Sequence, residues 1–380
     1  MAAGGPLLQL GGRAEGVGRG SGCGVHTALG ALMRILLTAD PEIEVPPRLY
    51  GGIERIVDGL ARRLRARGHV VCLVAKAGST SSVDVFHGWP GRRSQSRMDT
   101  IRNTRALWKA VRSFRPDVIH SFSRIAYLTP HLRGPTPIVM SYQRDPTLRA
   151  IRLAVKLAAP HVLTFTGCSD YVAACGRRGG GDWRGIPNFA EMDTLKSSPA
   201  VAPDAPLVFL SRVESIKGAH WAIEIARRTG RRLVIAGNHA DSGPEANYWH
   251  SQIAPWIGRD GIDYVGPVDD HQKSDLLGQA RAMIVPIQWD EPFGIVFAEA
   301  LACGTPVISC PRGSLTEIVR QGIDGFLIRS VEEGCEAVEK AGAIDRANCR
   351  HRAEEKYSPE VVVGRYLDLY DEARQRLRHR

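Results

Sequence analysis

Short apolar segments alternate with longer segments of helical periodicity along most of the chain. In the first half, the strand candidates are residues 35–38, 69–75, 117–120, 137–141 and 162–167. The alternation resumes after a stretch rich in Pro and Ser, 197–206, with candidates 207–211, 232–236, 264–266, 282–287, 306–309 and 326–328. Apolar strands that alternate with helices predict parallel sheets covered on both faces. The interruption predicts two such sheets, which face one another across a cleft.

Residues 290–309, DEPFGIVFAEALACGTPVIS, predict a loop, a helix and a strand in that order. Glu291 follows an apolar strand, whereas Glu299 lies within the helix. Between them, the backbone amides of Phe293, Gly294 and Ile295 begin the helix, and a helix N-terminus favours anions. Carboxylates on either side of an anion site suit a ligand with hydroxyls at both ends and phosphates between them, because a carboxylate accepts charge-assisted hydrogen bonds. A nucleotide-sugar has that shape.

Two other interpretations of these carboxylates stay open. Charged residues are mostly exposed, so the helix could simply present solvated Glu side chains. The pair could also be the acid and the base or nucleophile of a glycosidase, which requires a carboxyl separation that the sequence does not contain. The glycosidase interpretation leaves the anion-binding start of the helix unexplained.

A second cluster of charges supports the same site. Arg212 and Lys217 lie in the connection that follows strand 207–211. Ligands of open α/β sheets bind outside the carboxyl ends of the strands. Two cations at that edge can neutralise a diphosphate leaving group, and Arg does so with a fixed fork of donors.

These motifs resemble those of the retaining glycosyltransferases of family four. The resemblance rests on Glu291-x7-Glu299 with its flanking Pro-Phe-Gly and Cys-Gly-Thr-Pro-Val, and on Arg212-x4-Lys217-Gly. It implies that Glu291 contacts the transferred sugar, that Glu299 holds the ribose, and that the two cations bind the donor diphosphate. It also implies the GT-B fold, which consists of two Rossmann-like α/β domains, and retention of the anomeric configuration.

The alternation of strands and helices gives the domain boundaries, and the family resemblance implies the role of each domain. Residues 33–190 are the expected acceptor-binding domain and 207–355 the expected donor-binding domain, with 191–206 as the linker. Residues 356–380 are expected to form a helix that crosses back to the first domain. Residues 1–32, which hold ten of the forty glycines, are interpreted as a flexible N-terminal extension.

The family resemblance adds further residues to the predicted site. Gly51 and Gly52 are similar to a Gly-Gly loop where bare backbone approaches the diphosphate or the acceptor, and a plain turn is the alternative. His120 is a candidate cleft residue, or a hydrogen-bonded structural histidine. Gly313 and Ser314 stand where the family has Gly-Gly, and are candidate phosphate neighbours. The chain departs from the family at Phe122, where a second His near the sugar is common.

Charge is distributed unequally and bears on the acceptor. Residues 33–190 contain 25 Lys and Arg against 11 Asp and Glu, whereas residues 191–380 contain 23 against 28. A basic first domain attracts anions, so the acceptor is expected to be phosphorylated, carboxylated or membrane-anchored. The arginines of the predicted helix 53–68, such as Arg62 and Arg65, either draw in that acceptor or an anionic lipid surface, or form an ordinary solvated face. No nucleic-acid-binding motif accompanies the basic pI of about 9.4.

Composition and short motifs bear on the location of the protein and on its need for a metal ion. No segment reaches eighteen apolar residues. The eight cysteines form no Cys-x-x-Cys, which agrees with a reducing cytoplasm. We therefore predict a cytoplasmic protein. The basic first domain adds peripheral contact with the inner membrane face as an option for its location. No Asp-x-Asp occurs, so the carboxylate pair that would hold a divalent ion is missing and the predicted enzyme is metal-independent. The family resemblance implies a hexosyltransferase that needs no cofactor and takes a nucleoside-diphosphate sugar, such as a UDP-sugar, as donor. A 2-epimerase, a phosphorylase and a non-catalytic nucleotide-sugar sensor are the alternatives.

Overall fold

Seven parallel strands form the sheet of the first half of the chain. The computed structural model describes residues 1, 31–48 and 51–379, and residues from Met33 onward form one compact unit. The strand order is β3-β2-β1-β4-β5-β6-β7. The strands are β1 Arg34–Thr38, β2 Val70–Lys76, β3 Val85–Trp89, β4 Val118–Ser121, β5 Ile138–Tyr142, β6 Leu163–Gly167 and β7 Asp182–Gly185.

The helices of this half cover both faces of the sheet. Packed side chains form one hydrophobic cluster on each face, because a parallel strand is buried on both sides. The helices are α1 Gly52–Ala66, α2 Arg97–Phe114, α3 Leu148–Leu157 and α4 Asp170–Arg177, with a 3-10 segment, η1, at Ile125–His131.

Six parallel strands form the sheet of the second half. Their order is β10-β9-β8-β11-β12-β13. The strands are β8 Leu207–Leu210, β9 Leu233–Ala236, β10 Ile262–Gly266, β11 Ala282–Val285, β12 Val307–Ser309 and β13 Gly325–Leu327. The helices are α5 Ala219–Arg228, α6 Gly243–Tyr248, α7 Asp270–Gln279, α8 Ile295–Ala302, α9 Leu315–Ile318, α10 Val331–Ala341 and α11 Arg346–Tyr357, with short segments η2 Ser215–Lys217, η3 Trp249–Ile253 and η4 Ala254–Trp256. The predicted pair of parallel α/β sheets is therefore confirmed.

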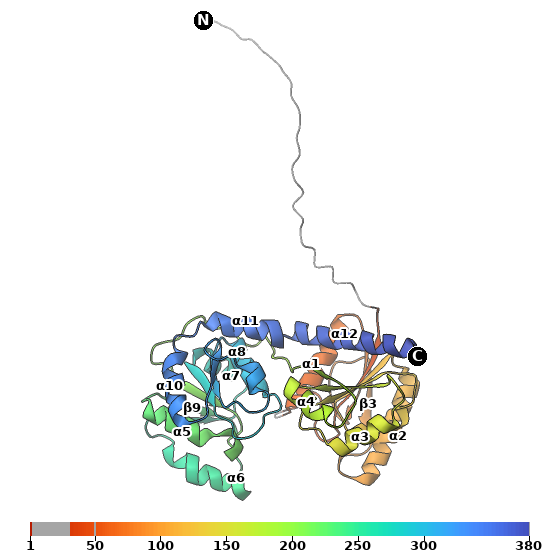
Figure 1. Cartoon of the computed structure of the whole chain (residues 1–380), viewed down its shortest axis with the longest axis horizontal. Helices are drawn as coiled ribbons and strands as arrows, with labels where there is room; N and C mark the ends of the chain where they lie inside the picture. Colours follow the sequence, from red (N-terminus) through yellow and green to blue (C-terminus); the bar gives the residue numbers. More distant parts are fainter. Residues whose placement is uncertain (2–30, 49–50, 380) are drawn as a thin grey trace. The chain divides into compact units, whose positions relative to one another are not determined.

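The last helix, α12 (Pro359–Arg378), belongs to the core of the first half. It follows α11, which packs with the second half, and the two helices run one after the other along one side of the molecule (Figure 1). Val362, Tyr366 and Tyr370 of α12 are buried in the cluster that also contains Ile35 of β1 and Leu60 of α1. The helix thus packs into the first half after the chain has passed through the second.

Two strands escaped prediction, and both lie at an edge of the first sheet. Side chains of β3 alternate between exposed and covered positions, and β7 contains Asp182, Arg184 and Gly185. An edge strand is solvated on one side, so it does not need the continuous apolar run that marks a central parallel strand. Nearly all of the predicted extension, residues 1–32, lies outside the described residues.

Within the part of the chain that the structure describes, no helix is both long and apolar enough to cross a membrane.

Candidate functional site

Two loops of the second half meet where its strand order reverses. Strands β8 and β11 are neighbours, and the chain continues from them toward opposite edges of the sheet. The loop after β8 carries Lys217, and the loop after β11 carries Glu291. The amide of Gln288 donates a hydrogen bond of 2.7 Å to the carbonyl of Ile216, which joins the two loops. Ligands of open α/β sheets bind at such a switch point.

Lys217 and Glu291 form a buried ion pair. Lys217 Nζ lies 2.5 Å from Glu291 Oε2, and the two side chains are only 11% and 10% exposed. Trp289 Nε1 donates to the same carboxylate oxygen at 2.9 Å, and the ammonium lies 5.0 Å from the centroid of the Trp289 ring. The structure thus brings a predicted cation and a predicted carboxylate into direct contact. Trp289 was missed because a single Trp in a loop carries no pattern.

The loop after β12 supports Glu291 from behind. Gly313 has a φ of +58°, and a Cβ there would come within 2.3 Å of the carbonyl oxygen of Glu291, so glycine is required. The fully buried Ser314 donates its amide to the same carbonyl at 2.9 Å and its hydroxyl to the carbonyl of Phe293 at 3.1 Å. These two predicted phosphate neighbours therefore lie beside the Glu291 loop, and the Ser314 hydroxyl holds its backbone.

Helix α8 begins directly after this loop. Gly294 is its N-cap with a φ of +71°, and a Cβ there would lie 2.5 Å from the ring of Phe297. Phe293 is buried, whereas Gly294 and Ile295 retain partial exposure. The first amides of an α-helix have no partner within the helix, so this end can donate to an anion.

Residues of the first half approach the same helix start. A Cβ built on Gly52, the first residue of α1, would lie 3.5 Å from the Cδ1 atom of Ile295. Gly51 is the N-cap of α1. Ser169, at the start of α4, donates its hydroxyl to the carbonyl of Pro292 at 2.6 Å. The predicted Gly-Gly turn and the predicted anion site are therefore neighbours.

Glu299 lies one turn further along α8 and contacts a lysine that the sequence analysis missed. Lys273 Nζ of α7 lies 2.5 Å from Glu299 Oε1 and 3.0 Å from Asp270 Oδ1. Burial acts to lower the pKa of Lys273, but the charges of Glu299 and Asp270 outweigh it and raise that pKa above its ordinary value. A lysine within a polar helix resembles any solvated one, so only the fold reveals this contact.

Arg212, the other predicted cation, contacts the carboxylate of Glu214 in its own loop. Its side chain is 40% exposed. It follows β8 at the same sheet edge as Lys217.

His120 lies apart from the other predicted site residues. It has no exposed surface and sits in β4, where its Nδ1 lies 2.5 Å from the hydroxyl of Tyr370 and its Nε2 lies 2.6 Å from the hydroxyl of Ser141. Burial lowers the pKa of His120 to about 3. A side chain without accessible surface has none to offer a ligand, so the structure favours the hydrogen-bonded structural role for His120 over the predicted substrate contact.

The arginines of α1 are engaged by carboxylates. Arg62 Nε lies 2.9 Å from Asp58 Oδ2, and Arg65 Nη2 lies 3.0 Å from Asp84 Oδ1. Arg62 also reaches Glu191, at 3.4 Å. These contacts reduce the charge that Arg62 and Arg65 offer to an anionic partner.

Asp40 marks the carboxyl edge of the first sheet, just beyond β1. Arg144 Nη2 lies 3.3 Å from its Oδ2, while its Oδ1 is buried and has no hydrogen-bond partner. Burial, reinforced by the nearby charge of Glu42, raises the pKa of Asp40 to about 6. The sequence held a signal for this residue, because an Asp directly follows the first apolar strand.

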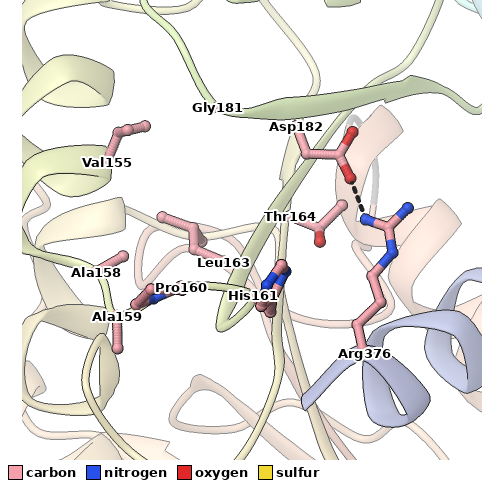
Figure 2. Close-up of a pocket in the computed structure, with 10 residues that line it drawn as sticks. All are labelled: Val155, Ala158, Ala159, Pro160, His161, Leu163, Thr164, Gly181, Asp182 and Arg376. Atoms are coloured by element: carbon pink, nitrogen blue, oxygen red, sulfur yellow. Dashed lines mark hydrogen bonds and ion pairs between the residues drawn. The ribbon is translucent and has the colours of Figure 1, made fainter. Parts of the chain in front are cut away.

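A separate hollow lies at the opposite edge of the first sheet. It is lined by residues at the amino ends of β6 and β7, including Leu163 and Gly181, and by Arg376 of α12 (Figure 2). Arg376 Nη1 lies 2.6 Å from Asp182 Oδ2 across it. It is remote from the carboxyl ends of the strands, so we do not assign it to the candidate site.

Across residues 31–48 and 51–379, no three His, Cys, Asp or Glu side chains are grouped as they would be around a metal ion.

Models of two glycosyltransferase families match the chain. The model described as "Glycosyltransferase Family 4" matches residues 50–191, and that described as "Glycosyl transferases group 1" matches residues 193–355. Together they cover every strand of the two sheets except β1, and they include the loops that carry Lys217 and Glu291. The chain belongs to glycosyltransferase family four.

Relatives within this glycosyltransferase family are similar over part of their length. D-inositol 3-phosphate glycosyltransferase of Stackebrandtia nassauensis is 31% identical over 149 residues, which is 39% of this chain and 31% of that protein. D-inositol 3-phosphate glycosyltransferase 2 of Catenulispora acidiphila is 34% identical over 162 residues, which is 40% of this chain and 38% of that protein. The alignments therefore span about a third of these relatives.

Solved structures are similar over nearly the whole of this family-four chain. AviGT4, a glycosyltransferase involved in avilamycin A biosynthesis, has a TM-score of 0.69 at 24% identity, and the match covers 90% of this chain and 98% of AviGT4. Anabaena HepE, solved in complex with UDP-glucose, also has a TM-score of 0.69, at 18% identity, covering 90% and 100% of the two chains. With the two parallel sheets, these likenesses confirm the predicted GT-B fold.

Proposed function

We propose that this protein transfers a sugar from a nucleoside-diphosphate sugar to an acceptor hydroxyl, with retention of the anomeric configuration. The observation that carries the proposal is the buried pair of Lys217 and Glu291 beside the start of α8, at the strand-order switch point of a family-four chain. HepE was solved with UDP-glucose, which supports a UDP-sugar as the donor.

Each group at this site has a chemical task in the proposed transfer. Lys217, Arg212 and the first amides of α8 would stabilise the negative charge that grows on the diphosphate as the bond to the sugar breaks. Glu291 is held by Lys217 and Trp289 and would orient the sugar hydroxyls. Glu299, further along α8, would accept hydrogen bonds from the ribose. The proposed chemistry uses no metal ion and no cofactor.

The acceptor would bind at the carboxyl edge of the first sheet. Asp40, Arg144 and the Gly51-Gly52 turn lie at that edge. An anionic acceptor is supported by the excess of basic residues in 33–190 and by relatives whose names include an inositol phosphate. Contact with the inner membrane face rests on the same excess of charge and stays a proposal, as does cytoplasmic location.

A panel of nucleoside diphosphates and nucleotide-sugars tests the donor. Ligand at a hundred times its dissociation constant raises the free energy of unfolding by about 2.7 kcal/mol, so a productive donor should shift the melting temperature clearly. Failure of all common nucleotide-sugars to stabilise the protein would contradict the proposal.

Product analysis tests the reaction. Incubation of the stabilising donor with and without phosphorylated polyols separates transfer from epimerisation and from phosphorolysis. The anomeric configuration of the product is read by NMR, and an inverted product would refute retention. A donor that binds but is never turned over would instead indicate a nucleotide-sugar sensor.

A further inference from the structure

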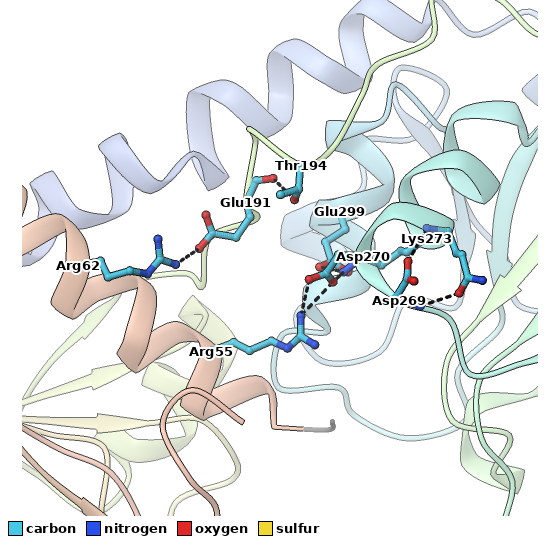
Figure 3. A network of polar contacts seen from close by, with 9 residues as sticks. Arg55, Arg62, Glu191, Thr194, Asp269, Asp270, Lys273 and Glu299 are labelled. Carbon is cyan, nitrogen blue, oxygen red and sulfur yellow. Dashed lines mark hydrogen bonds and ion pairs between the residues drawn. The ribbon is translucent and has the colours of Figure 1, made fainter. Parts of the chain in front are cut away.

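Four charged side chains form a continuous chain from the first half of the protein to Glu299. Arg55 Nη1 of α1 lies 2.9 Å from both carboxylate oxygens of Asp270. Asp270 Oδ1 accepts from Lys273 at 3.0 Å, and Lys273 in turn donates to Glu299 Oε1 at 2.5 Å. Figure 3 shows these side chains converging between α1, α7 and α8. The chain alternates in sign at every step.

The environment of Lys273 indicates that its position is specified. It lies in the first turn of α7, where the helix dipole disfavours a positive charge. Its side chain is only 14% exposed and that of Glu299 only 13%. Burial of a lysine at a helix N-terminus is unfavourable unless partner charges offset it, and here two carboxylates do so.

The contact leaves part of Glu299 available. Lys273 engages the Oε1 atom, and a carboxylate has about four acceptor positions on its two oxygens. A carboxylate fixed by a lysine on one side is held in one orientation, so its remaining lone pairs can be pre-organised for a ligand.

We propose that Lys273 is a positioning residue that orients Glu299 toward the ribose hydroxyls of the donor, and that Asp270 links this lysine to Arg55. This inference rests on the proposed function, because it takes Glu299 as the ribose contact. Asp270 is shared between Arg55 and Lys273. When Arg55 engages it, Asp270 attracts Lys273 less, and the ammonium is held more closely by Glu299. Nucleotide binding then strengthens when the two halves are in contact at α1 and α7.

The test of Lys273 measures the contribution of the ribose hydroxyls to binding. The probes are UDP and its 2′,3′-dideoxy analogue, titrated by calorimetry into the full chain. The wild-type protein should prefer UDP by about tenfold to a hundredfold, because a hydrogen bond to a charged group has that effect. Lys273→Met should reduce the preference to less than about threefold, and Lys273→Arg should restore part of it.

A merely structural lysine would give a different result. It would lower the affinity for both probes alike and leave the preference intact, which would overturn the proposal. Glu299→Gln should reduce the preference by itself, and adding Lys273→Met to it should change the preference no further. A further loss in that double variant would mean that Lys273 acts by another route. If wild-type protein binds neither UDP, GDP nor ADP, the proposed function fails, and the positioning role of Lys273 fails with it.

The link to the first half has its own test with a matched control. Arg55→Met should weaken UDP binding by up to about fivefold, the range of an exposed ion pair. This effect is expected even though Arg55 lies in the first half and the proposed nucleotide site in the second. The effect should vanish in an Asp270→Asn background. Arg62→Met, on the same helix but paired with Asp58 and Glu191, should leave UDP binding unchanged. Equal effects of the two arginine variants, or an Arg55 effect that persists without Asp270, would refute the link.

Discussion

Replacing Lys217 by Met should destabilise the protein and reduce turnover for separable reasons. The Lys217 and Glu291 side chains are about nine-tenths covered, and their charged atoms lie 2.5 Å apart. Removing the ammonium leaves a buried carboxylate that still accepts a hydrogen bond from Trp289 Nε1. Breaking one partner of a buried pair costs about 3–5 kcal/mol. For a domain of 150–250 residues, this corresponds to roughly 6–20 °C in melting temperature.

A double variant separates stability from chemistry. Lys217→Met combined with Glu291→Gln removes both charges and keeps an acceptor for Trp289, so most of the lost stability should return. Turnover should stay low, because neither group is left to act on the diphosphate or the sugar. Differential scanning fluorimetry gives the melting temperatures, and steady-state kinetics give kcat.

The matched control is Lys340→Met on the exposed face of α10. Lys340 lies 3.0 Å from Glu336, but these side chains are 62% and 70% exposed, so the change should cost at most about 1 kcal/mol. If the Lys217→Met variant has the same melting temperature as the wild-type protein, the buried pair is not a stabilising contact. If the double variant regains full turnover, the pair is structural and the diphosphate role of Lys217 is refuted.

Four further outcomes follow from the structure. Glu299→Ala should weaken nucleotide binding by about 1.5–3 kcal/mol in calorimetry, and unchanged affinity in a folded variant would exclude the ribose role. Arg212→Ala should lower kcat more than donor affinity, since charge on the diphosphate grows in the transition state; an equal loss in both would contradict this. Burial holds the pKa of His120 near 3, against an ordinary value of 6.5. Between these pH values the unfolded chain binds a proton that the folded chain does not bind. The free energy of unfolding should therefore fall by up to about 1.4 kcal/mol per pH unit as the pH drops from 6.5 toward 3. His120→Gln should flatten that decline when the free energy of unfolding is measured by urea denaturation. An unchanged pH slope in this variant would show that His120 is not its cause. Changing Arg62 and Arg65 together to Ser should leave the salt dependence of acceptor KM between about 50 and 300 mM unchanged, because carboxylates already engage both arginines, and a flattened dependence would show that they attract the acceptor.

Much of the fold was predictable because its central strands are short apolar runs between helices. Strands such as β1 and β8 are buried on both faces. They therefore need a continuous run of apolar residues, which is visible in the sequence. The edge strands β3 and β7 were missed, since exposure on one side removes the requirement. The linker predicted at 191–206 rests on the stretch rich in Pro and Ser at 197–206, which lies between β7 and β8.

The candidate site was predictable where chemistry and loop position coincide. Glu291 and Lys217 follow strands that a parallel sheet brings to one edge, so their meeting could be expected. Lys273 could not be found, because its contact with Glu299 depends on how two helices pack. His120 had two interpretations until the structure placed Tyr370 against it, and that partner lies 250 residues away in sequence.

The crossing of α12 has a consequence for how the chain is made. Val362, Tyr366 and Tyr370 fill part of the first hydrophobic core, yet a ribosome delivers them after the entire second half. Until α12 has been synthesised, the first half therefore exposes the apolar surface that this helix covers. Partly folded proteins with such exposed surface aggregate or bind chaperones. Completion of the first half is thereby tied to synthesis of α12, so truncated products that stop before this helix should be recognised by the cell as incomplete and removed.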